Sequence, residues 1–290
     1  MSKVVIFGGS GFIGSHVADA LSEANYEVVI YDSEPSKYLI ENQKIVLGKL
    51  DDLEKITETT SKAEVVYNFA ALSDLNESMD RPIDTIQTNI LGNCNILEAC
   101  RINSVRRFVY ASSVYVNSRQ GGFYGASKKS AELFVDEYQR EFGLEYTILR
   151  YGSLYGPRSD NKNGLRKIVS EAVLNQSLKY HGNKDSVREY IHVKDAALAS
   201  VAALESKFIN KKLILTGQQP IKLVDLLAML AEMMNYPKKS INFVNEEYKG
   251  HYVRTPYHHD SDLAQKYIPD TFVDLGEGLL ELIRDCTKDK

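Results

Sequence analysis

The fold of this chain is decided by the stretch KVVIFGGSGFIG, which occupies residues 3–14. Its first part, Lys3–Phe7, is a β-branched and apolar run that predicts a buried strand. Glycines follow at Gly8, Gly11 and Gly14, and apolar residues then recur at the spacing of an amphipathic helix. A strand, a glycine-rich turn and a helix in this order predict the opening unit of a doubly wound α/β fold.

The spacing of the three glycines predicts a dinucleotide site. A Cβ atom at these positions would hold a pyrophosphate away from the helix N-terminus, whose free N–H groups and dipole attract anions. The alternative is a phosphate loop of the kind that binds nucleoside triphosphates. It fails because Ser15 stands where that loop needs its lysine.

The identity of the dinucleotide follows from Asp32, which comes directly after the apolar run Val28–Tyr31. A carboxylate at the end of the second strand can accept both ribose hydroxyls of an adenosine, and it repels a 2′-phosphate. No arginine lies in the glycine loop or directly after Asp32. We therefore expect NAD rather than NADP as the cofactor.

The first half of the chain alternates short apolar runs with helical periodicity. Continuously apolar strands separated by helices predict a parallel sheet that is covered on both faces. The predicted strands are Lys3–Phe7, Glu27–Tyr31, Lys44–Val46, Val65–Phe69, Arg107–Ala111 and Tyr146–Arg150. The predicted helices are 12–24, 51–60, 82–103 and 124–142.

After about residue 152 the pattern becomes intermittent. Residues 152–164 have the composition of a loop, and helices are then predicted at 165–177, 195–206, 222–235 and 275–286, with short strands near 178–181, 187–191 and 213–216. The expected fold class is α/β, a Rossmann-type doubly wound parallel sheet with a smaller mixed α/β substrate-binding lobe. We expect an NAD-binding domain at 1–160, to which about 187–217 return, and a mainly substrate-binding lobe at 161–290.

Composition excludes several classes of partner. The net charge is −4 and the pI is near 5.9, so no basic surface for nucleic acid is expected. The apolar stretch 196–204 is far shorter than the roughly 18 residues of a membrane span.

Three cysteines without metal-ligand spacing fit a reducing, cytoplasmic compartment. The histidine-rich segment 251–260 contains proline and adjacent histidines, which rarely converge on one ion, so we expect no metal.

A candidate for the chemistry lies at the start of the fourth predicted helix. Tyr124 and Lys128 are four residues apart and share one helical face. A free phenol has a pKa near 10, and an adjacent ammonium together with a positive nicotinamide ring would favour the phenolate. Lowering the pKa to about 7 takes roughly 4 kcal/mol, which two nearby cations can supply in a partly dry site.

These motifs together resemble a known family. The glycine loop, Asp32, the Asn68–Ala71 segment, Asn89, Ser113 and the Tyr124–Lys128 pair look like those of the extended short-chain dehydrogenase/reductases. Within that family, the chain is similar to the nucleotide-sugar epimerase/dehydratase branch and to UDP-glucose 4-epimerases. The resemblance continues through 149–158 and 188–195, and it covers nearly the whole chain.

The resemblance implies a role for each matching residue. Tyr124 would exchange a proton with the sugar hydroxyl, Lys128 would hold the nicotinamide ribose, and Ser113 would bind the reacting oxygen. The residues implied at the cofactor are Gly8, Gly11, Phe12, Ile13, Gly14, Asp32, Ala70, Lys128 and Tyr151. Those implied at the nucleotide-diphosphate sugar are Ser73, Ser153, Arg188 and Arg254. For Arg188, a surface ion pair with Glu189 or Asp185 is the alternative.

One departure from the family pattern excludes a reaction. Sugar-nucleotide 4,6-dehydratases carry an Asp-Glu pair directly after the catalytic hydroxyl, because eliminating water needs an acid and a base besides the tyrosine. Here the two positions are Val114 and Tyr115, so we reject a dehydratase. The segment between Ser113 and Tyr124 is also much shorter than is usual in the family, which predicts a more open or differently capped sugar pocket.

The resemblance leaves three functions open. We favour a sugar-nucleotide 4-epimerase, which keeps NAD bound and passes through a 4-keto sugar. The alternatives are a net C4 dehydrogenase or 4-ketoreductase, and a non-catalytic NAD-binding regulatory protein. Family members commonly pair two helices, here 82–103 and 124–142, and we expect a homodimer. Apolar residues at helical spacing on those helices fit this, although packing in the core would give the same pattern: Ile86, Ile90 and Leu97, and Ala131, Phe134 and Tyr138.

Overall fold

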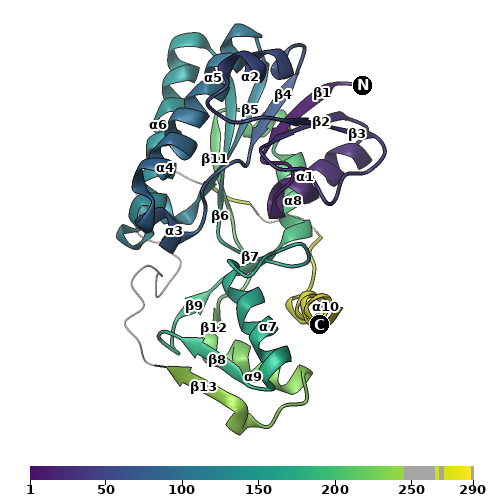
Figure 1. Ribbon diagram of the computed structural model, residues 1–290, viewed down its shortest axis with the longest axis vertical. Helices are drawn as coiled ribbons and strands as arrows, with labels where there is room; N and C mark the ends of the chain where they lie inside the picture. The colour runs from purple at the N-terminus through teal and green to yellow at the C-terminus, as the bar shows by residue number, and fades with distance from the viewer. Residues whose placement is uncertain (245–264, 268–270, 289–290) are drawn as a thin grey trace.

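The computed structural model describes residues 1–244, 265–267 and 271–288. It has a larger part, in which helices cover both faces of a twisted sheet, and a smaller part beyond the carboxyl ends of the strands (Figure 1). This arrangement confirms the predicted Rossmann-type α/β class. The described residues include no helix that is both long and apolar enough to cross a bilayer.

The larger part is built on one sheet, whose strand order is β14-β11-β6-β5-β4-β1-β2-β3. All of its pairings are parallel. The strands are β1 (Lys3–Phe7), β2 (Glu27–Asp32), β3 (Gln43–Leu47), β4 (Val65–Asn68), β5 (Arg107–Ser113), β6 (Glu145–Tyr151), β11 (Lys211–Leu215) and β14 (Gln265–Lys266). The six strands predicted in the first half are therefore confirmed, each within two residues of its predicted bounds.

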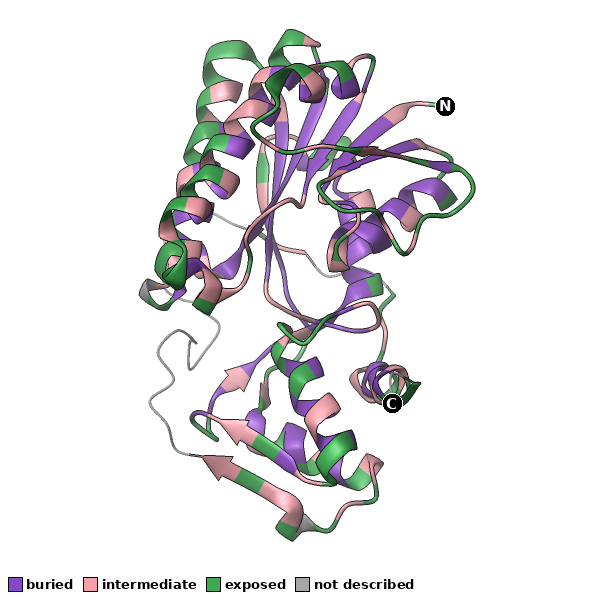
Figure 2. Ribbon diagram, viewed as in Figure 1, coloured by how far each residue is buried: buried purple, intermediate pink, exposed green. Residues whose placement is uncertain are grey.

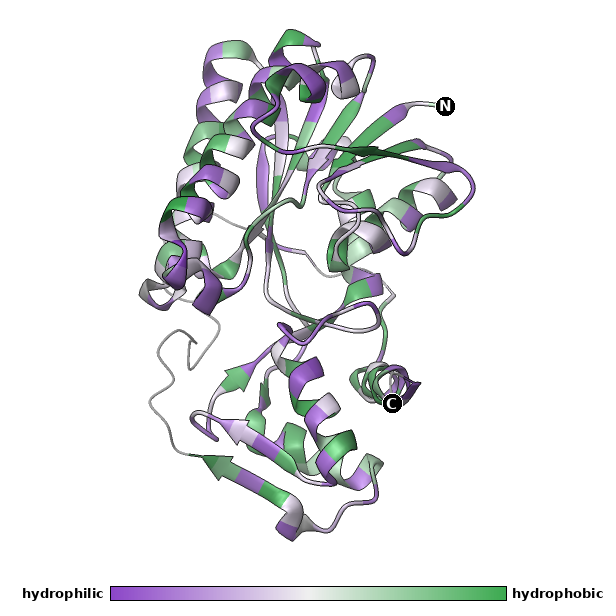
Figure 3. Ribbon diagram, in the orientation of Figure 1, coloured by the Kyte–Doolittle hydropathy of each residue, from purple (hydrophilic) through white to green (hydrophobic). Residues whose placement is uncertain are grey.

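The sheet is buried on both faces because its strands alternate their side chains between two cores. In β1, whose hydrophobic run is green in Figure 3, Val4 and Ile6 pack on one side and Val5 and Phe7 on the other. The first core is closed by α1 (Phe12–Glu23) and α8 (Val193–Ala202). The second is closed by α2 (Leu53–Thr60), α5 (Gly92–Ile102) and α6 (Gly122–Phe142). The buried strands between exposed outer helix faces are visible in Figure 2.

The predicted helix at 82–103 is one continuous stretch in the sequence pattern but three segments in the structure. It consists of α4 (Pro82–Ile86), a π-helical turn (Gln87–Leu91) and α5. The short helix α3 (Leu75–Asp80), capped by the Asp74 side chain, precedes it and was not predicted. Two 3₁₀ turns, Val114–Asn117 and Arg119–Gly121, fill the short connection between β5 and α6.

The smaller part is a mixed α/β layer. Its strands pair as β7 (Ser153–Tyr155) with β10 (Tyr190–His192), β9 (Val187–Arg188) with β12 (Ile221–Lys222), and β8 (Leu178–His181) with β13 (Ile241–Val244). Its helices are α7 (Gly164–Asn175), α9 (Leu223–Met233) and α10 (Leu275–Lys288), and they share a third hydrophobic core. Residues 152–164 were predicted as a loop but contain β7. This strand is too short for apolar and polar residues to alternate recognisably along it.

The chain passes between the two parts more than once. After β6 it enters the smaller part through β7 and α7, and it returns to the larger part for α8 and β11. It then builds β12, α9 and β13 in the smaller part, and β14 joins the main sheet beside β11. Both parts therefore contain segments that are far apart in the sequence.

Candidate active site

The residues predicted from the sequence converge at one edge of the main sheet. The glycine loop follows β1, Asp32 ends β2, Ala70 lies just after β4, Ser113 ends β5 and Tyr151 ends β6. These are the carboxyl ends of parallel strands, and they face the smaller part (Figure 1). This edge is where open α/β sheets bind their ligands.

The glycine loop packs closely against its own backbone, and it can do so only because Gly8 and Gly14 lack side chains. Gly8 has a φ of +75°, and a Cβ atom there would lie 2.5 Å from the Ala70 nitrogen. A Cβ atom on Gly14 would lie 2.2 Å from the Gly8 carbonyl oxygen. Helix α1 begins after Gly11 with no side-chain cap and no acidic residue in its first turn. Its N-terminal N–H groups are therefore suited to a pyrophosphate.

Asp32 is held against this loop by the backbone. Its Oδ2 accepts the Ser10 N–H at 2.9 Å, and its Oδ1 accepts the Glu34 N–H at 3.3 Å. The Ser10 hydroxyl donates to the Glu34 carbonyl at 3.0 Å, which ties the end of β2 to the loop. Carboxylate oxygens accept more than one hydrogen bond, so Asp32 keeps capacity for ribose hydroxyls.

Removing this carboxylate should weaken NAD binding. We expect Asp32→Ala to raise the Kd for NAD by about 10- to 100-fold, because hydrogen bonds to a charged group contribute roughly 1.5–3 kcal/mol. Calorimetric titration of NAD and NADP measures the effect. The matched control is Asp51→Ala, an exposed carboxylate after β3, which should leave the Kd unchanged. Equal losses in both variants would contradict the role of Asp32.

The catalytic candidates meet between β5 and α6. The half-buried Tyr124 makes a side-chain hydrogen bond with Ser113. The Lys128 Nζ donates to the Ala111 carbonyl at 2.7 Å and lies 6.0 Å from the centre of the Tyr124 ring. The ring of Tyr115 meets that of Tyr124 edge to face at 6.3 Å. The structure therefore brings together the three residues predicted to carry the chemistry.

Burial has the largest effect on the pKa values of Tyr124 and Lys128. It raises the pKa of the Tyr124 phenol to about 12, against which only the Ser113 hydrogen bond acts. It also lowers the pKa of Lys128 to about 7, against the opposing charge of Glu132. The sequence led us to expect that the ammonium would lower the phenol pKa. Among the groups of the protein, the burial of the phenol outweighs such an effect, and its pKa is raised rather than lowered.

Asn89 braces the wall of the site from the π-helical turn. Its Nδ2 donates to the Leu72 carbonyl at 3.0 Å and to the Ser127 hydroxyl at 2.9 Å, and its Oδ1 accepts the Leu72 N–H at 2.8 Å. The wider π turn directs this buried amide between the segment after β4 and helix α6. Asn89 thus fixes the backbone that leads from Ala70 to Ser73.

The residues predicted at the substrate are less closely grouped. Ser73 is exposed just before α3, and Ser153 is half-buried at the start of β7. Arg188 lies on β9 and is only 6% exposed, and its Nη1 donates to the Val187 carbonyl at 3.1 Å. Arg254 and the histidine-rich segment 251–260 lie outside the described residues.

His192 lies at the turn from β10 to α8. It is the N-cap of α8, and its Nδ1 accepts the Lys194 N–H at 3.4 Å. Its Nε2 lies 3.1 Å from a Glu281 oxygen on α10. Burial nevertheless lowers the pKa of the imidazole to about 4, so it is neutral at pH 7 and holds its turn without a charge.

One buried ion pair beside the catalytic candidates was not predicted from the sequence. Glu132, one turn after Lys128, forms a bidentate ion pair with Arg150, and the two side chains are 2% and 1% exposed. Two signals were available. Glu132 follows Lys128 at the same four-residue spacing as Lys128 follows Tyr124, and Arg150 is the one charged residue in the predicted strand Tyr146–Arg150.

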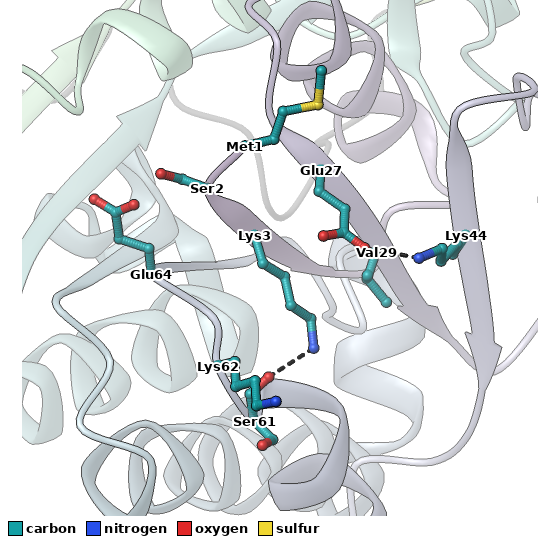
Figure 4. A pocket seen from close by; sticks show the side chains of 9 residues that line it. All are labelled: Met1, Ser2, Lys3, Glu27, Val29, Lys44, Ser61, Lys62 and Glu64. Carbon is teal, nitrogen blue, oxygen red and sulfur yellow. Dashed lines mark hydrogen bonds and ion pairs between the residues drawn. The ribbon is translucent and has the colours of Figure 1, made fainter.

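A depression at the opposite end of the sheet is unrelated to this site. It lies at the amino ends of β1, β2 and β3, and its lining includes Lys3, Glu27 and Lys44 (Figure 4). Lys3 donates to the Thr59 and Ser61 carbonyls, both at 2.8 Å, and Lys44 pairs with Glu27 at 2.8 Å. These charged groups are satisfied by the protein, so the depression offers no evident ligand chemistry.

The fold and site define a class before any comparison is made. A glycine loop ahead of a helix, an aspartate after β2 and a Ser-Tyr-Lys group at the end of β5 belong to NAD-linked oxidoreductases of the short-chain type. Residues 4–214 match the family model described as "NAD dependent epimerase/dehydratase family". The chain therefore belongs to this family, and its cofactor is NAD. It is an enzyme of the extended short-chain class, in the nucleotide-sugar branch.

Individual relatives agree on the class and differ in their reactions. Protein CapI of Staphylococcus aureus is 31% identical over 67% of this chain and 66% of its own. A UDP-N-acetyl-alpha-D-glucosaminuronate decarboxylase of Bacillus cytotoxicus is 28% identical over 82% of each chain. The structure of a UDP-glucose 4-epimerase from Thermotoga maritima with UDP-glucose has a TM-score of 0.83, with 26% identity over 99% of each chain. The likeness thus spans the whole fold.

Proposed function

We propose that this enzyme is a sugar-nucleotide 4-epimerase. The observation that carries the proposal is the Ser113-Tyr124-Lys128 group at the end of β5, beside the glycine loop and without a carboxylate pair next to it. Val114 and Tyr115 follow Ser113, and Val114 is buried. Neither side chain can supply the acid and base that elimination of water requires.

The residues have distinct tasks in this reaction. Tyr124 takes the proton from the C4 hydroxyl of the sugar and later returns it, and Ser113 hydrogen-bonds the same oxygen. Lys128 lies beside the Tyr124 ring and would bind a ribose hydroxyl of the cofactor. NAD, when bound, supplies a hydride acceptor that can give the hydride back. Inversion requires that the 4-keto sugar turn over before this return.

The smaller part is proposed to bind the nucleotide diphosphate. Arg188 is the main candidate, because a guanidinium forms paired hydrogen bonds with phosphate oxygens. Ser73, Ser153 and Arg254 are proposed as further contacts. Residues 161–290 would then serve mainly as the substrate-binding lobe, with 1–160 and about 187–217 serving the cofactor.

A net C4 dehydrogenase or 4-ketoreductase is the second candidate. Its support is the short connection between β5 and α6, where two 3₁₀ turns replace the longer loop usual in the family. A less enclosed pocket would let a 4-keto product leave before it is reduced. The similarity to a decarboxylase also shows that relatives of this chain carry out more than epimerisation.

The two candidates are separated by what accumulates. The enzyme is incubated with NAD and a panel of nucleotide sugars, while absorbance at 340 nm and the sugar products are both followed. Epimerisation should convert substrate to its C4 epimer without a lasting rise in absorbance. A rise that grows with every turnover would instead establish the net dehydrogenase. The Tyr124→Phe variant serves as the control for background reduction.

We also propose a homodimer through α6 and the 82–103 stretch, which consists of α4, the π-helical turn and α5 and packs beside α6. Part of the predicted apolar stripe is core, since Leu97 and Ala131 are fully buried. Other apolar residues on this side are exposed: Ile83, Ile86, Leu91, Leu133 and Phe134. This exposed apolar set, which lies on α4, the π-helical turn and α6, is suited to a second copy of the same surface.

A charge on this surface should dissociate the dimer. Leu133→Glu, at a position that is 60% exposed, is expected to give a monomer by light scattering, because a buried carboxylate would have no partner across the interface. The matched control is Leu198→Glu on α8, at the opposite face of the sheet and 51% exposed, which should stay dimeric. A monomeric wild-type protein would contradict the proposal.

A further inference from the structure

Three consecutive residues at the end of β5 are each tied to a different turn of α6. The Ala111 carbonyl accepts from Lys128 at 2.7 Å, and Ser113 hydrogen-bonds Tyr124. Between them, the Ser112 hydroxyl donates to Glu132 at 2.5 Å. Because positions 124, 128 and 132 lie one turn apart, they form a row on one face of the helix. Glu132 therefore extends the row that holds the two catalytic candidates.

The Glu132 carboxylate is locked in the interior by Arg150. The Arg150 Nε donates to Oε1 at 3.0 Å and its Nη2 to Oε2 at 2.7 Å. Lys212 of β11 lies 3.8 Å from Oε2 and pairs at 2.9 Å with Asp136. Burying an ion pair costs about as much desolvation as it returns in attraction, so stability alone does not explain this pair. Its place one turn from Lys128 suggests another role.

The groups around Lys128 make Glu132 its counter-charge. From β5, the Tyr110 ring lies 4.9 Å from the Lys128 Nζ, and from α6 the Tyr124 ring lies at 6.0 Å. Burial raises the pKa of Tyr110, as it does that of Cys94 on α5, so both stay neutral. Arg150 and Lys212 are cations that bear on Glu132. The negative charge of Glu132 opposes the desolvation of the lysine.

We propose that Glu132, fixed by Arg150, is a positioning residue that keeps Lys128 protonated and directed at the Tyr124 phenol. The proposal rests on the function proposed above, in which Tyr124 must lose and regain a proton. A protonated lysine stabilises the phenolate, whereas a neutral lysine does not. Without Glu132, burial would leave Lys128 neutral at the pH where the enzyme works.

The charge of Lys128 can be measured without turnover. Lysine labelled with ¹³C at Cε reports each ammonium titration by NMR, and the Lys128→Met variant assigns the signal. Glu132→Gln should lower the titration midpoint of Lys128 by roughly one to two pH units. The matched control is Asp136→Asn, which removes a carboxylate one turn further along α6 and should leave the midpoint unchanged. An unchanged midpoint in Glu132→Gln would overturn the proposal.

Folding defects are separated from this effect by two further variants. Glu132→Gln leaves the Arg150 charge buried, so the double variant Glu132→Gln/Arg150→Met removes both charges and relieves that penalty. Its Lys128 midpoint should still fall. Glu132→Asp retains the charge and should restore a midpoint near that of wild type. A double variant that titrates like wild type would reject Glu132 as the counter-charge.

Turnover provides the second readout. In Glu132→Gln, the limb of the kcat/KM profile that reports Tyr124 should move to higher pH, with about a tenfold loss at pH 7 and little change in KM. A purely structural role would lower activity equally at every pH. If wild type turns over no sugar nucleotide, the proposed function fails, and the NMR midpoints still decide the role of Glu132. If wild type is active and the midpoints coincide, only the role of Glu132 fails.

Discussion

Replacing Tyr124 by phenylalanine should reduce turnover by about 10²- to 10⁴-fold, the usual contribution of a positioned acid or base. The change removes one oxygen, which hydrogen-bonds Ser113 and would exchange the proton of the sugar hydroxyl. The Kd for NAD should stay near that of wild type, because the glycine loop and Asp32 are untouched. Steady-state kinetics and a calorimetric titration of NAD measure the two quantities.

The matched control for this change is Tyr115→Phe. Tyr115 contacts the Tyr124 ring at 6.3 Å and loses the same atom, but it is not expected to exchange a proton. Its turnover should fall less than tenfold. A Tyr115→Phe variant with the larger loss would transfer the catalytic role to Tyr115 and contradict the arrangement proposed here.

Replacing Lys128 by methionine should abolish turnover and yet stabilise the protein. Lys128 is 3% exposed, and burial lowers its pKa from 10.5 to about 7. Methionine fills a similar volume without a charge. We expect the free energy of unfolding at pH 6 to rise by about 2–4 kcal/mol, after allowing about 1 kcal/mol for the lost hydrogen bond to Ala111.

The pH dependence gives this prediction its sign. The unfolded chain holds the Lys128 proton up to about pH 10.5, whereas the folded protein releases it near pH 7. Between these values the unfolded state binds more protons, so the stability of wild type rises with pH. Below pH 7 both states are protonated and the penalty is fully present. The advantage of Lys128→Met should therefore be largest at pH 6 and shrink toward pH 10.

Urea unfolding at pH 6, 7.5 and 9 measures this dependence. The neighbouring Lys129 is exposed, so Lys129→Met is the matched control and should leave the pH dependence of wild type intact. A Lys128→Met variant that is less stable than wild type at pH 6 would contradict the prediction, because it would show that burying the Lys128 charge does not destabilise the folded protein.

The sequence predicted the central sheet well because its inner strands are buried on both faces. An apolar run such as Val65–Asn68 has no other stable place in a protein of this kind. The misses are elements whose conformation is set by neighbours. Ser153–Tyr155 becomes a strand by pairing with Tyr190–His192, and the π turn at Gln87–Leu91 turns Asn89 into the wall of the site. Neither leaves a periodic signal in the local sequence.

In the candidate site, too, the positions of residues could be predicted from the sequence, whereas properties set by the surrounding structure could not. Gly8, Asp32, Ser113, Tyr124 and Lys128 were found because each has a fixed place relative to a strand end, and the topology brings strand ends together. Protonation could not be predicted, since it depends on how deeply the fold buries a group. Composition cannot distinguish an exposed Tyr-Lys pair from one in which burial raises the pKa of the tyrosine and lowers that of the lysine.

The repeated passage of the chain between its two parts limits how such an enzyme can change. Strand β11 lies beside β6 in the main sheet, and α8 closes the core over α1, although both follow β7 and α7 of the smaller part. A chain cut near residue 160 would leave β6 as an open, apolar edge. The two parts therefore cannot be exchanged as modules between relatives. A new substrate preference has to arise by substitution within a single cooperative folding unit.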